Sequence, residues 1–182
     1  MSDLQFHRIP GMDGPPEAWV SSNQELDRLI SYHREDIKPA ARIATVIHHE
    51  LEAIFPLLDK VCRRTCPWCP DPCCIVTKVW YDFIDLVFLH LIEVPLPPGP
   101  LAYQLEEPCR YLSPRGCKLP RLIRPWGCIQ YICPTQRRNL HRRKPDDEAK
   151  LDLTLDKIRN KRYQLETAFQ HAMVCRAHIQ AD

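Results

Sequence analysis

Glycine is scarce in this 182-residue sequence, with 5 residues against 18 prolines. A fold rich in β-hairpins needs glycine in many of its tight turns, so the shortage favours helices joined by stiff loops. An excess of charge of one sign is also missing, because the formal net charge is only +2. Bulk charge therefore points neither to nucleic acid nor to a membrane surface. With this length and 45% hydrophobic residues, we expect one compact, mostly α-helical domain.

The sequence also lacks a long apolar run without charges. Five ionisable side chains interrupt the longest run, residues 76–94: Lys78, Asp82, Asp85, His90 and Glu93. So many charges argue against a bilayer span, and we expect no membrane partner. The first nineteen residues have no basic segment followed by an apolar one, so we expect no secretory signal and a cytoplasmic protein. Thiols stay reduced in that compartment, where clustered cysteines favour metal binding or catalysis over disulfides.

Several enzyme motifs are absent too. The sequence contains no HExxH motif, no nucleotide-binding glycine loop and no G-x-S-x-G motif. His49-x-x-Glu52 and His90-x-x-Glu93 have the opposite order to the Glu-x-x-His motif of di-iron bundles, so we expect surface or capping roles for them. We assign no catalytic residue, and the sequence leaves open whether the chain is an enzyme.

What the sequence has in abundance is cysteine. Nine of its ten cysteines lie in two blocks, CRRTCPWCPDPCC (residues 62–74) and CRYLSPRGCKLPRLIRPWGCIQYIC (residues 109–133). Cys66-x2-Cys69 has the spacing at which two thiolates bind one ion from a tight turn, and soft thiolates suit zinc or an iron–sulfur cluster. We predict eight metal ligands: Cys66, Cys69, Cys73, Cys74, Cys109, Cys117, Cys128 and Cys133.

Two cysteines are left out of this ligand set. Cys62 ends a predicted helix one turn before Cys66, and the sequence leaves its role open. Cys175 lies among apolar neighbours on another predicted helix, so we expect it to pack as a small apolar residue. A nucleophilic Cys74 or Cys128 is a further alternative, although no histidine base is paired with either in the sequence.

The order of the cysteines resembles that of the YkgJ-type cysteine-cluster proteins, which are described as zinc- or iron-chelating. The resemblance covers residues 62–135, and the PDP segment before the CC pair is one residue longer than is common in that family. CPDPCC followed by Trp80 is also similar to the cysteine block of flagellin lysine methylases. The resemblance implies metal binding, often labelled iron–sulfur, and implies no reaction. The positions that match are Cys66, Cys69, Cys73, Cys74, Cys109, Cys117, Cys128 within RPWGC, and Cys133.

Zinc and an iron–sulfur cluster remain alternatives. Eight thiolates fit two all-cysteine zinc sites, or one four-iron cluster with thiols left over. Trp68, Trp126 and Tyr131 would shield a centre from water, which favours the cluster. We expect an electron-transfer or structural binding module with a protein or redox partner. The competing hypotheses are a nucleic-acid-binding zinc protein and a metal-dependent enzyme domain related to protein lysine methylases.

A basic run, RRNLHRRK at residues 137–144, follows the second cysteine block. Its five fixed positive charges suit contact with the phosphates of RNA or DNA. It can equally be a solvated connector, because Asp146, Asp147 and Glu148 offset its charge. We expect at most weak, non-specific association with nucleic acid.

We divide the chain into an N-terminal arm with helices (residues 1–61), the cysteine module (62–135), and a basic linker with a C-terminal amphipathic helix (136–182). Residues 1–21 are expected to be irregular, and a Ser22–Glu25 capping box predicts a helix over residues 23–34.

Two apolar stripes and one apolar run predict the other helices. A stripe from Ile43 to Val61 predicts a helix that starts near Pro39 and leads to Cys62. Residues 76–92 are apolar on nearly all sides and predict a buried helix, with a strand as the alternative. A proline-rich connector follows. The last helix, from about residue 146, has a stripe that Arg162 interrupts: Leu151, Leu155, Ile158, Leu165, Phe169 and Ala172.

Overall fold

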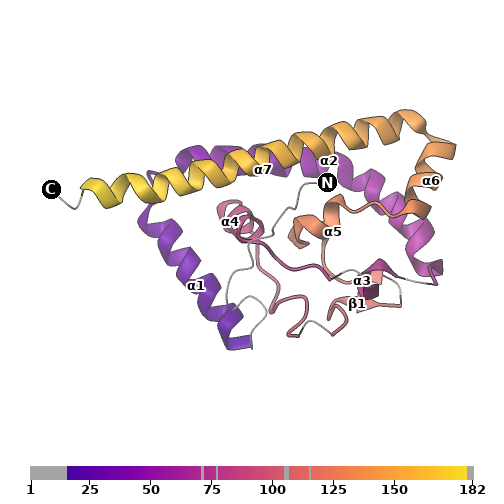
Figure 1. The fold of residues 1–182 in the computed structure, drawn as a ribbon, viewed down its shortest axis with the longest axis horizontal. Coiled ribbons are helices and arrows are strands. Elements are labelled where there is room, and N and C mark those ends of the chain that lie inside the picture. Colours follow the sequence, from indigo (N-terminus) through magenta and orange to yellow (C-terminus); the bar gives the residue numbers. More distant parts are fainter. Residues whose placement is uncertain (1–15, 71, 77, 105–106, 115, 180–182) are drawn as a thin grey trace.

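A computed structural model describes residues 16–70, 72–76, 78–104, 107–114 and 116–179. These residues form a mostly α-helical fold, as the sequence predicts (Figure 1). In chain order the elements are α1 (Pro16–Tyr32), α2 (Lys38–Thr65), the 3-10 helix η1 (Cys66–Trp68), α3 (Cys73–Val76), α4 (Phe83–Leu91), β1 (Leu112–Ser113), β2 (Gly116–Cys117), the 3-10 helix η2 (Arg121–Ile123), α5 (Trp126–Gln130), α6 (Pro134–Arg143) and α7 (Pro145–Ile179).

The two long helices α2 and α7 pack side by side along the upper edge of Figure 1. Pro39 lies in the first turn of α2, where its missing N–H costs no hydrogen bond. Burial of an apolar stripe on each helix drives their packing. Both predicted stripes are confirmed, with Ile43 only partly buried and Ala40 and Ala44 added to the buried face of α2.

The N-terminal helix differs from the prediction. α1 spans Pro16–Tyr32, so residues 16–21 are helical rather than irregular, and Ser22 and Glu25 lie inside the helix instead of capping it. Residues 1–15 of the predicted arm lie outside the described residues. The reason is tertiary: Trp19 is 2% exposed, its ring packs at a tilt of 51° with its centroid 5.3 Å from that of Tyr81, and its indole N–H donates to the Pro97 carbonyl at 3.1 Å. These contacts stabilise the first turns, which local propensity alone does not.

The predicted buried helix over residues 76–92 is half right. α4 starts only at Phe83, because the Asp82 carboxylate accepts the Asp85 N–H at 2.6 Å while Asp85 accepts the Asp82 N–H at 3.1 Å. This reciprocal capping box fixes the helix start. The described residues between α3 and α4 are not helical.

The cysteine module contains only short elements. The hairpin of β1 and β2 pairs Leu112 with Cys117, and Gly116 adopts a φ of 102°, which favours glycine. Residues 94–98 of the proline-rich connector have no regular structure. The basic run, predicted as a connector, lies largely in α6.

In the described ranges, no helix combines the length and the apolar character needed to cross a membrane.

Candidate functional site

Two thiols meet at the C-terminal end of α2. Cys62 and Cys66 are one helical turn apart, so they lie on one face of the helix, and both are half-buried. The Gln136 side-chain amide donates to both sulfurs, at 3.3 Å to Cys62 Sγ and 3.6 Å to Cys66 Sγ. A lone pair on each of the two cysteine sulfurs therefore faces the Gln136 side-chain nitrogen.

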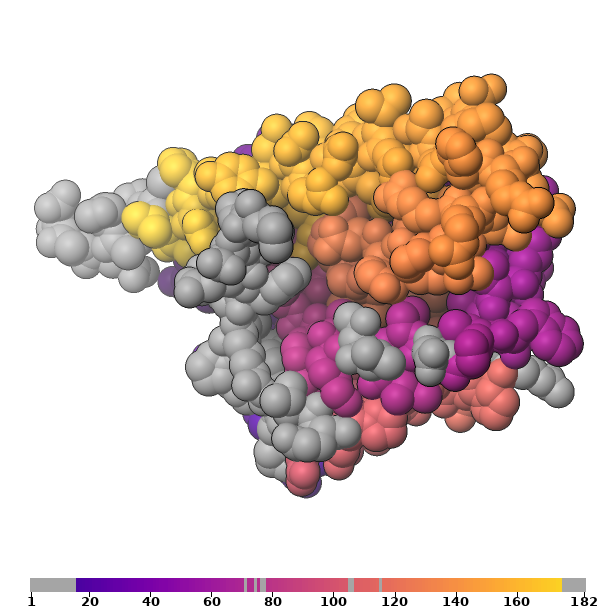
Figure 2. All heavy atoms as spheres, turned by 45° about the vertical axis from the view of Figure 1, so that its right-hand side comes forward, coloured from indigo at the N-terminus to yellow at the C-terminus, as the bar shows by residue number. Residues whose placement is uncertain are grey.

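A third thiol is joined to this pair through the start of α6. Cys133 caps that helix: its sulfur accepts the Gln136 backbone N–H, and its own N–H donates to Gln136 Oε1 at 3.2 Å. α6 packs on the end of α2, and Figure 2 shows the orange surface of α6 above the purple surface there. We call Cys62, Cys66 and Cys133 the three-thiol group. Sequence reasoning missed its organiser, Gln136, because a cysteine stands where serine or threonine usually begins a capping box.

Cations surround one side of the three-thiol group. The hydrogen bond from Cys66, followed by the hydrogen bond and charge of Arg121 and the charge of Arg124, lowers the pKa of Cys62 to about 5 against the effect of burial. The same hydrogen bond raises the pKa of Cys66. Arg121 is 9% exposed and is held by Asp59, whose carboxylate accepts its Nε–H at 2.7 Å. The neighbouring thiol and the two cations therefore favour the thiolate form of Cys62.

The three other cysteines of the second block lie around two tyrosines. Cys109, Cys117 and Cys128 are half-buried and pack against the hydrophobic core. Burial, then the Asp85 charge and the Cys128 charge, raise the pKa of Tyr81. Cys117 also raises the pKa of Tyr81, and burial, followed by smaller charge effects that include Cys109, raises that of Tyr111. Each tyrosine donates to a backbone carbonyl: Tyr81 to Ile123 at 2.6 Å, and Tyr111 to Gly99 at 2.9 Å.

The remaining predicted ligands belong to the first block. Cys69 follows η1, and its N–H donates to the Cys66 carbonyl at 3.2 Å. Cys73 begins α3 and is half-buried. Cys74 lies in α3, but its side chain is outside the described part of the structure, as is that of Cys175. The predicted packing role of Cys175 therefore stays a prediction.

The donor chemistry of these residues fits a soft metal, since thiolates are the preferred ligands of zinc and iron–sulfur clusters. Across the described ranges, no three side chains of cysteine, histidine, aspartate or glutamate lie close enough together to hold one ion. A bound metal would have to draw thiols together.

The predicted aromatic shield is wrong for two of its three members. Trp68, at the end of η1, is 83% exposed, and Tyr131, directly after α5, is 45% exposed. Only Trp126, at 5% exposure, is buried. Aromatic shielding therefore does not favour an iron–sulfur cluster over zinc.

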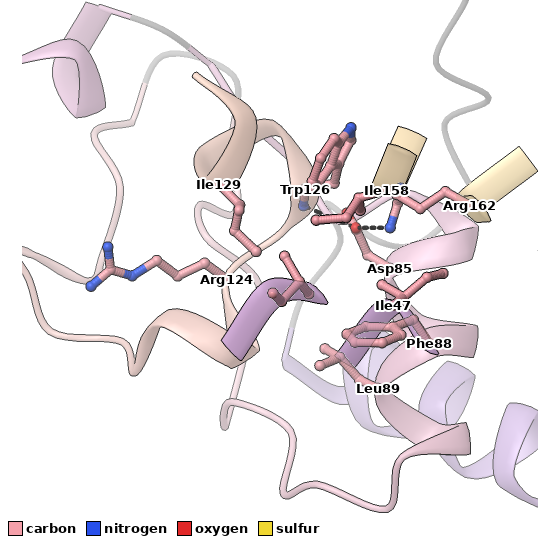
Figure 3. Close-up of a pocket in the computed structure, with 10 residues that line it drawn as sticks. Ile47, Asp85, Phe88, Leu89, Arg124, Trp126, Ile129, Ile158 and Arg162 are labelled. Carbon is pink, nitrogen blue, oxygen red and sulfur yellow. Dashed lines mark hydrogen bonds and ion pairs between the residues drawn. The ribbon is translucent and has the colours of Figure 1, made fainter. Parts of the chain in front are cut away.

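Trp126 is fixed by a buried ionic network. In the sequence, its arginine, Arg162, is visible only as an interruption of an apolar stripe. Asp85 Oδ1 accepts the Trp126 backbone N–H at 2.9 Å and lies 2.9 Å from an Arg162 nitrogen (Figure 3). Arg162 also bonds both carboxylate oxygens of Asp82, at 2.7 and 2.8 Å. A small cavity lies beside this network, lined by Asp85, Trp126 and Arg162. Arg124 also lines it, but its guanidinium points away from Asp85 (Figure 3). The network thus ties α4 and α7 to the start of α5, two residues before Cys128.

Close backbone packing supports the same attachment. A Cβ on Gly127 would lie 2.7 Å from a methyl carbon of Val79, so α5 can approach the chain before α4 only with glycine here.

The two His–Glu pairs of the sequence do not form metal sites in the described structure. His49 lies 3.9 Å from Glu52 on the exposed side of α2. His90 contacts Asn23 at 3.3 Å and Asp27 at 3.8 Å, and burial lowers its pKa.

Acidic side chains neutralise part of the basic run. Arg137 binds Asp152 at 2.7 Å and lies 3.5 Å from Glu148, and Lys144 lies 3.2 Å from Asp147. Two of the five fixed charges are therefore engaged by α7.

We accordingly expect this surface to bind RNA or DNA only weakly at physiological salt. Any binding should weaken with salt, with a log–log slope of roughly −0.7 to −0.9 per phosphate contacted. Gel retardation with the wild type and with Arg142→Glu/Arg143→Glu tests this expectation. A retarded band at submicromolar protein that the double variant loses would contradict it.

Comparisons with family models, with curated proteins and with solved structures return no match.

Proposed function

We propose that this chain is a metal-binding protein that holds zinc or an iron–sulfur cluster with cysteine thiolates from both cysteine-rich segments. The observation that carries the proposal is the meeting of Cys62 and Cys66 with Cys133 at Gln136, across about 70 residues of sequence. The donors that meet at Gln136 include three cysteine sulfurs, and zinc and iron prefer sulfur over the oxygen ligands that suit magnesium or calcium.

The other predicted ligands extend this donor set. Cys109, Cys117 and Cys128 lie around Tyr81 and Tyr111 on elements attached to the core. Cys69, Cys73 and Cys74 lie on the short segments between the end of α2 and the start of α4. A resident zinc would cross-link these segments, and a resident iron–sulfur cluster would also supply one-electron transfer.

Two further considerations support this function. The cysteine order is similar to that of the YkgJ-type proteins, a likeness that rests on the cysteine positions alone. Metal–thiolate sites need reduced thiols, so we also propose a cytoplasmic location. The module would act as an electron-transfer or structural unit that works with a protein or redox partner.

Anaerobic purification, metal analysis and an absorption spectrum test the proposal. Bound iron with acid-labile sulfide and visible absorbance identifies a cluster, whereas a colourless protein with zinc identifies a zinc site. We expect one of these two results. The proposal fails if the protein carries neither metal and takes up neither after reduction and reconstitution.

A further inference from the structure

We infer that Cys62, Cys66 and Cys133 form a binding site of their own for a thiophilic divalent cation, in which Cys62 is a direct ligand. This inference rests on the proposed metal-binding function and assigns a ligand that the cysteine pattern leaves out. It also divides the thiols into sites that cross the two sequence blocks, rather than one site per block.

The first step is the position of Cys62 on α2. Because residues four apart lie on one face of a helix, Cys62 and Cys66 point to the same side. Both sulfurs accept from the same Gln136 amide nitrogen, and both side chains are half-buried where α6 packs on the end of α2. The site is thus built on a long helix, which holds two donors more firmly than a loop does.

The second step is the role of Gln136. Its amide nitrogen donates to both sulfurs, and its amide oxygen is held by the Cys133 N–H. Gln136 is 7% exposed, so this arrangement is enclosed by protein. The amide hydrogens occupy the point at which two sulfur lone pairs converge, and a cation needs the same convergence. Metal binding would displace the amide from the sulfurs and draw the Cys133 thiol inward.

The third step is the separation from the other thiols. Cys109, Cys117 and Cys128 pack against the hydrophobic core, with Cys117 on the hairpin and Cys128 on α5, whereas the three-thiol group is assembled around Gln136. Three thiolates leave one coordination position of a tetrahedral ion open for water or an external thiol. The three-thiol group therefore suits a site that exchanges its metal or its fourth ligand.

Cadmium titration of the reduced, metal-free protein tests this inference, with the thiolate–cadmium charge-transfer absorbance as the readout. We expect Cys62→Ser to lose about one equivalent of cadmium and to keep the remainder. The matched control, Cys109→Ser, should keep the equivalent that Cys62→Ser loses. Wild-type cadmium stoichiometry and affinity in Cys62→Ser would overturn the inference and leave the proposed function standing, whereas no cadmium binding by the wild type would overturn both.

A second measurement needs no variant and so does not depend on the folding of one. Iodoacetamide alkylation of the wild type, read by mass spectrometry, reports each thiol separately. We expect cadmium to protect Cys62, Cys66 and Cys133 over the same concentration range. Protection of Cys66 and Cys133 with no protection of Cys62 contradicts its role as a ligand.

Discussion

Replacing Arg162 by methionine is expected to lower the free energy of unfolding by about 3–5 kcal/mol at pH 8, as measured by urea denaturation. The Arg162 side chain is only 10% exposed and forms ion pairs with Asp82 and with Asp85, whose side chain is 5% exposed. Methionine fills a similar volume, so the loss comes mainly from a buried carboxylate without its cation. The start of α5 loses its anchor as well, because Asp85 holds the Trp126 N–H.

The deficit should depend on pH in a definite direction. Burial raises the pKa of Asp85 from 3.8 to about 7, and the charge of Arg162 is the largest effect that lowers it. Without Arg162 the pKa rises further. A carboxyl with a raised pKa stabilises the fold below its unfolded-state pKa and loses that contribution as pH rises through its folded-state pKa. The deficit of Arg162→Met should therefore be smaller at pH 5 than at pH 8.

Arg159→Met is the matched control, because Arg159 lies on the same helix but is 53% exposed and pairs with the exposed Asp156. Its effect should stay within about 0.5 kcal/mol. If Arg162→Met loses no more free energy of unfolding than this control, or loses the same amount at pH 5 and pH 8, the buried charge network does not stabilise the fold.

Arg162 also shows where sequence reasoning succeeds and where it ends. The stripes of α2 and α7 follow from a period of three to four residues, which is a local property, and their burial is confirmed. Arg162 breaks the apolar stripe in the sequence, but it is buried in the fold because Asp82 and Asp85 pair with its charge. The sequence does not reveal this pairing, because Asp82 is 80 residues away. The start of α4 at Phe83 was readable from the Asp82–Asp85 capping box, but the apolar run before it hid the boundary.

The thiols follow the same division. Cysteine spacing indicates the chemistry, since clustered thiols suit soft metals. Spacing does not indicate which thiols meet. Cys62 and Cys66 approach Cys133 because α6 packs on α2, and α6 itself begins with a capping pair of Cys133 and Gln136. Long-range packing therefore decided the membership of the three-thiol group.

The last prediction concerns Cys69 and Cys128, one from each block. Cys69 directly follows the three-residue helix η1, and Cys128 lies in the five-residue helix α5, so a metal would supply much of the local stability. A ligand present at a hundred times its Kd adds about 2.7 kcal/mol. We expect Cys69→Ser and Cys128→Ser to lose metal, as measured by metal analysis, and to be cleaved by chymotrypsin up to about 100-fold faster within residues 62–135.

The structure indicates where that cleavage should begin and what it should spare. Trp68 is 83% exposed and adjoins Cys69, whereas Trp126 is buried and held by Asp85, so the first cut is expected after Trp68. Cys175→Ser is the matched control, since Cys175 lies on α7 outside both blocks, and it should keep the metal and the wild-type cleavage rate. Unchanged metal content and unchanged cleavage in both Cys69→Ser and Cys128→Ser would show that the module folds without help from a metal. A first cut near Trp126 would instead show that the Asp85–Arg162 network does not hold α5 once the metal is lost.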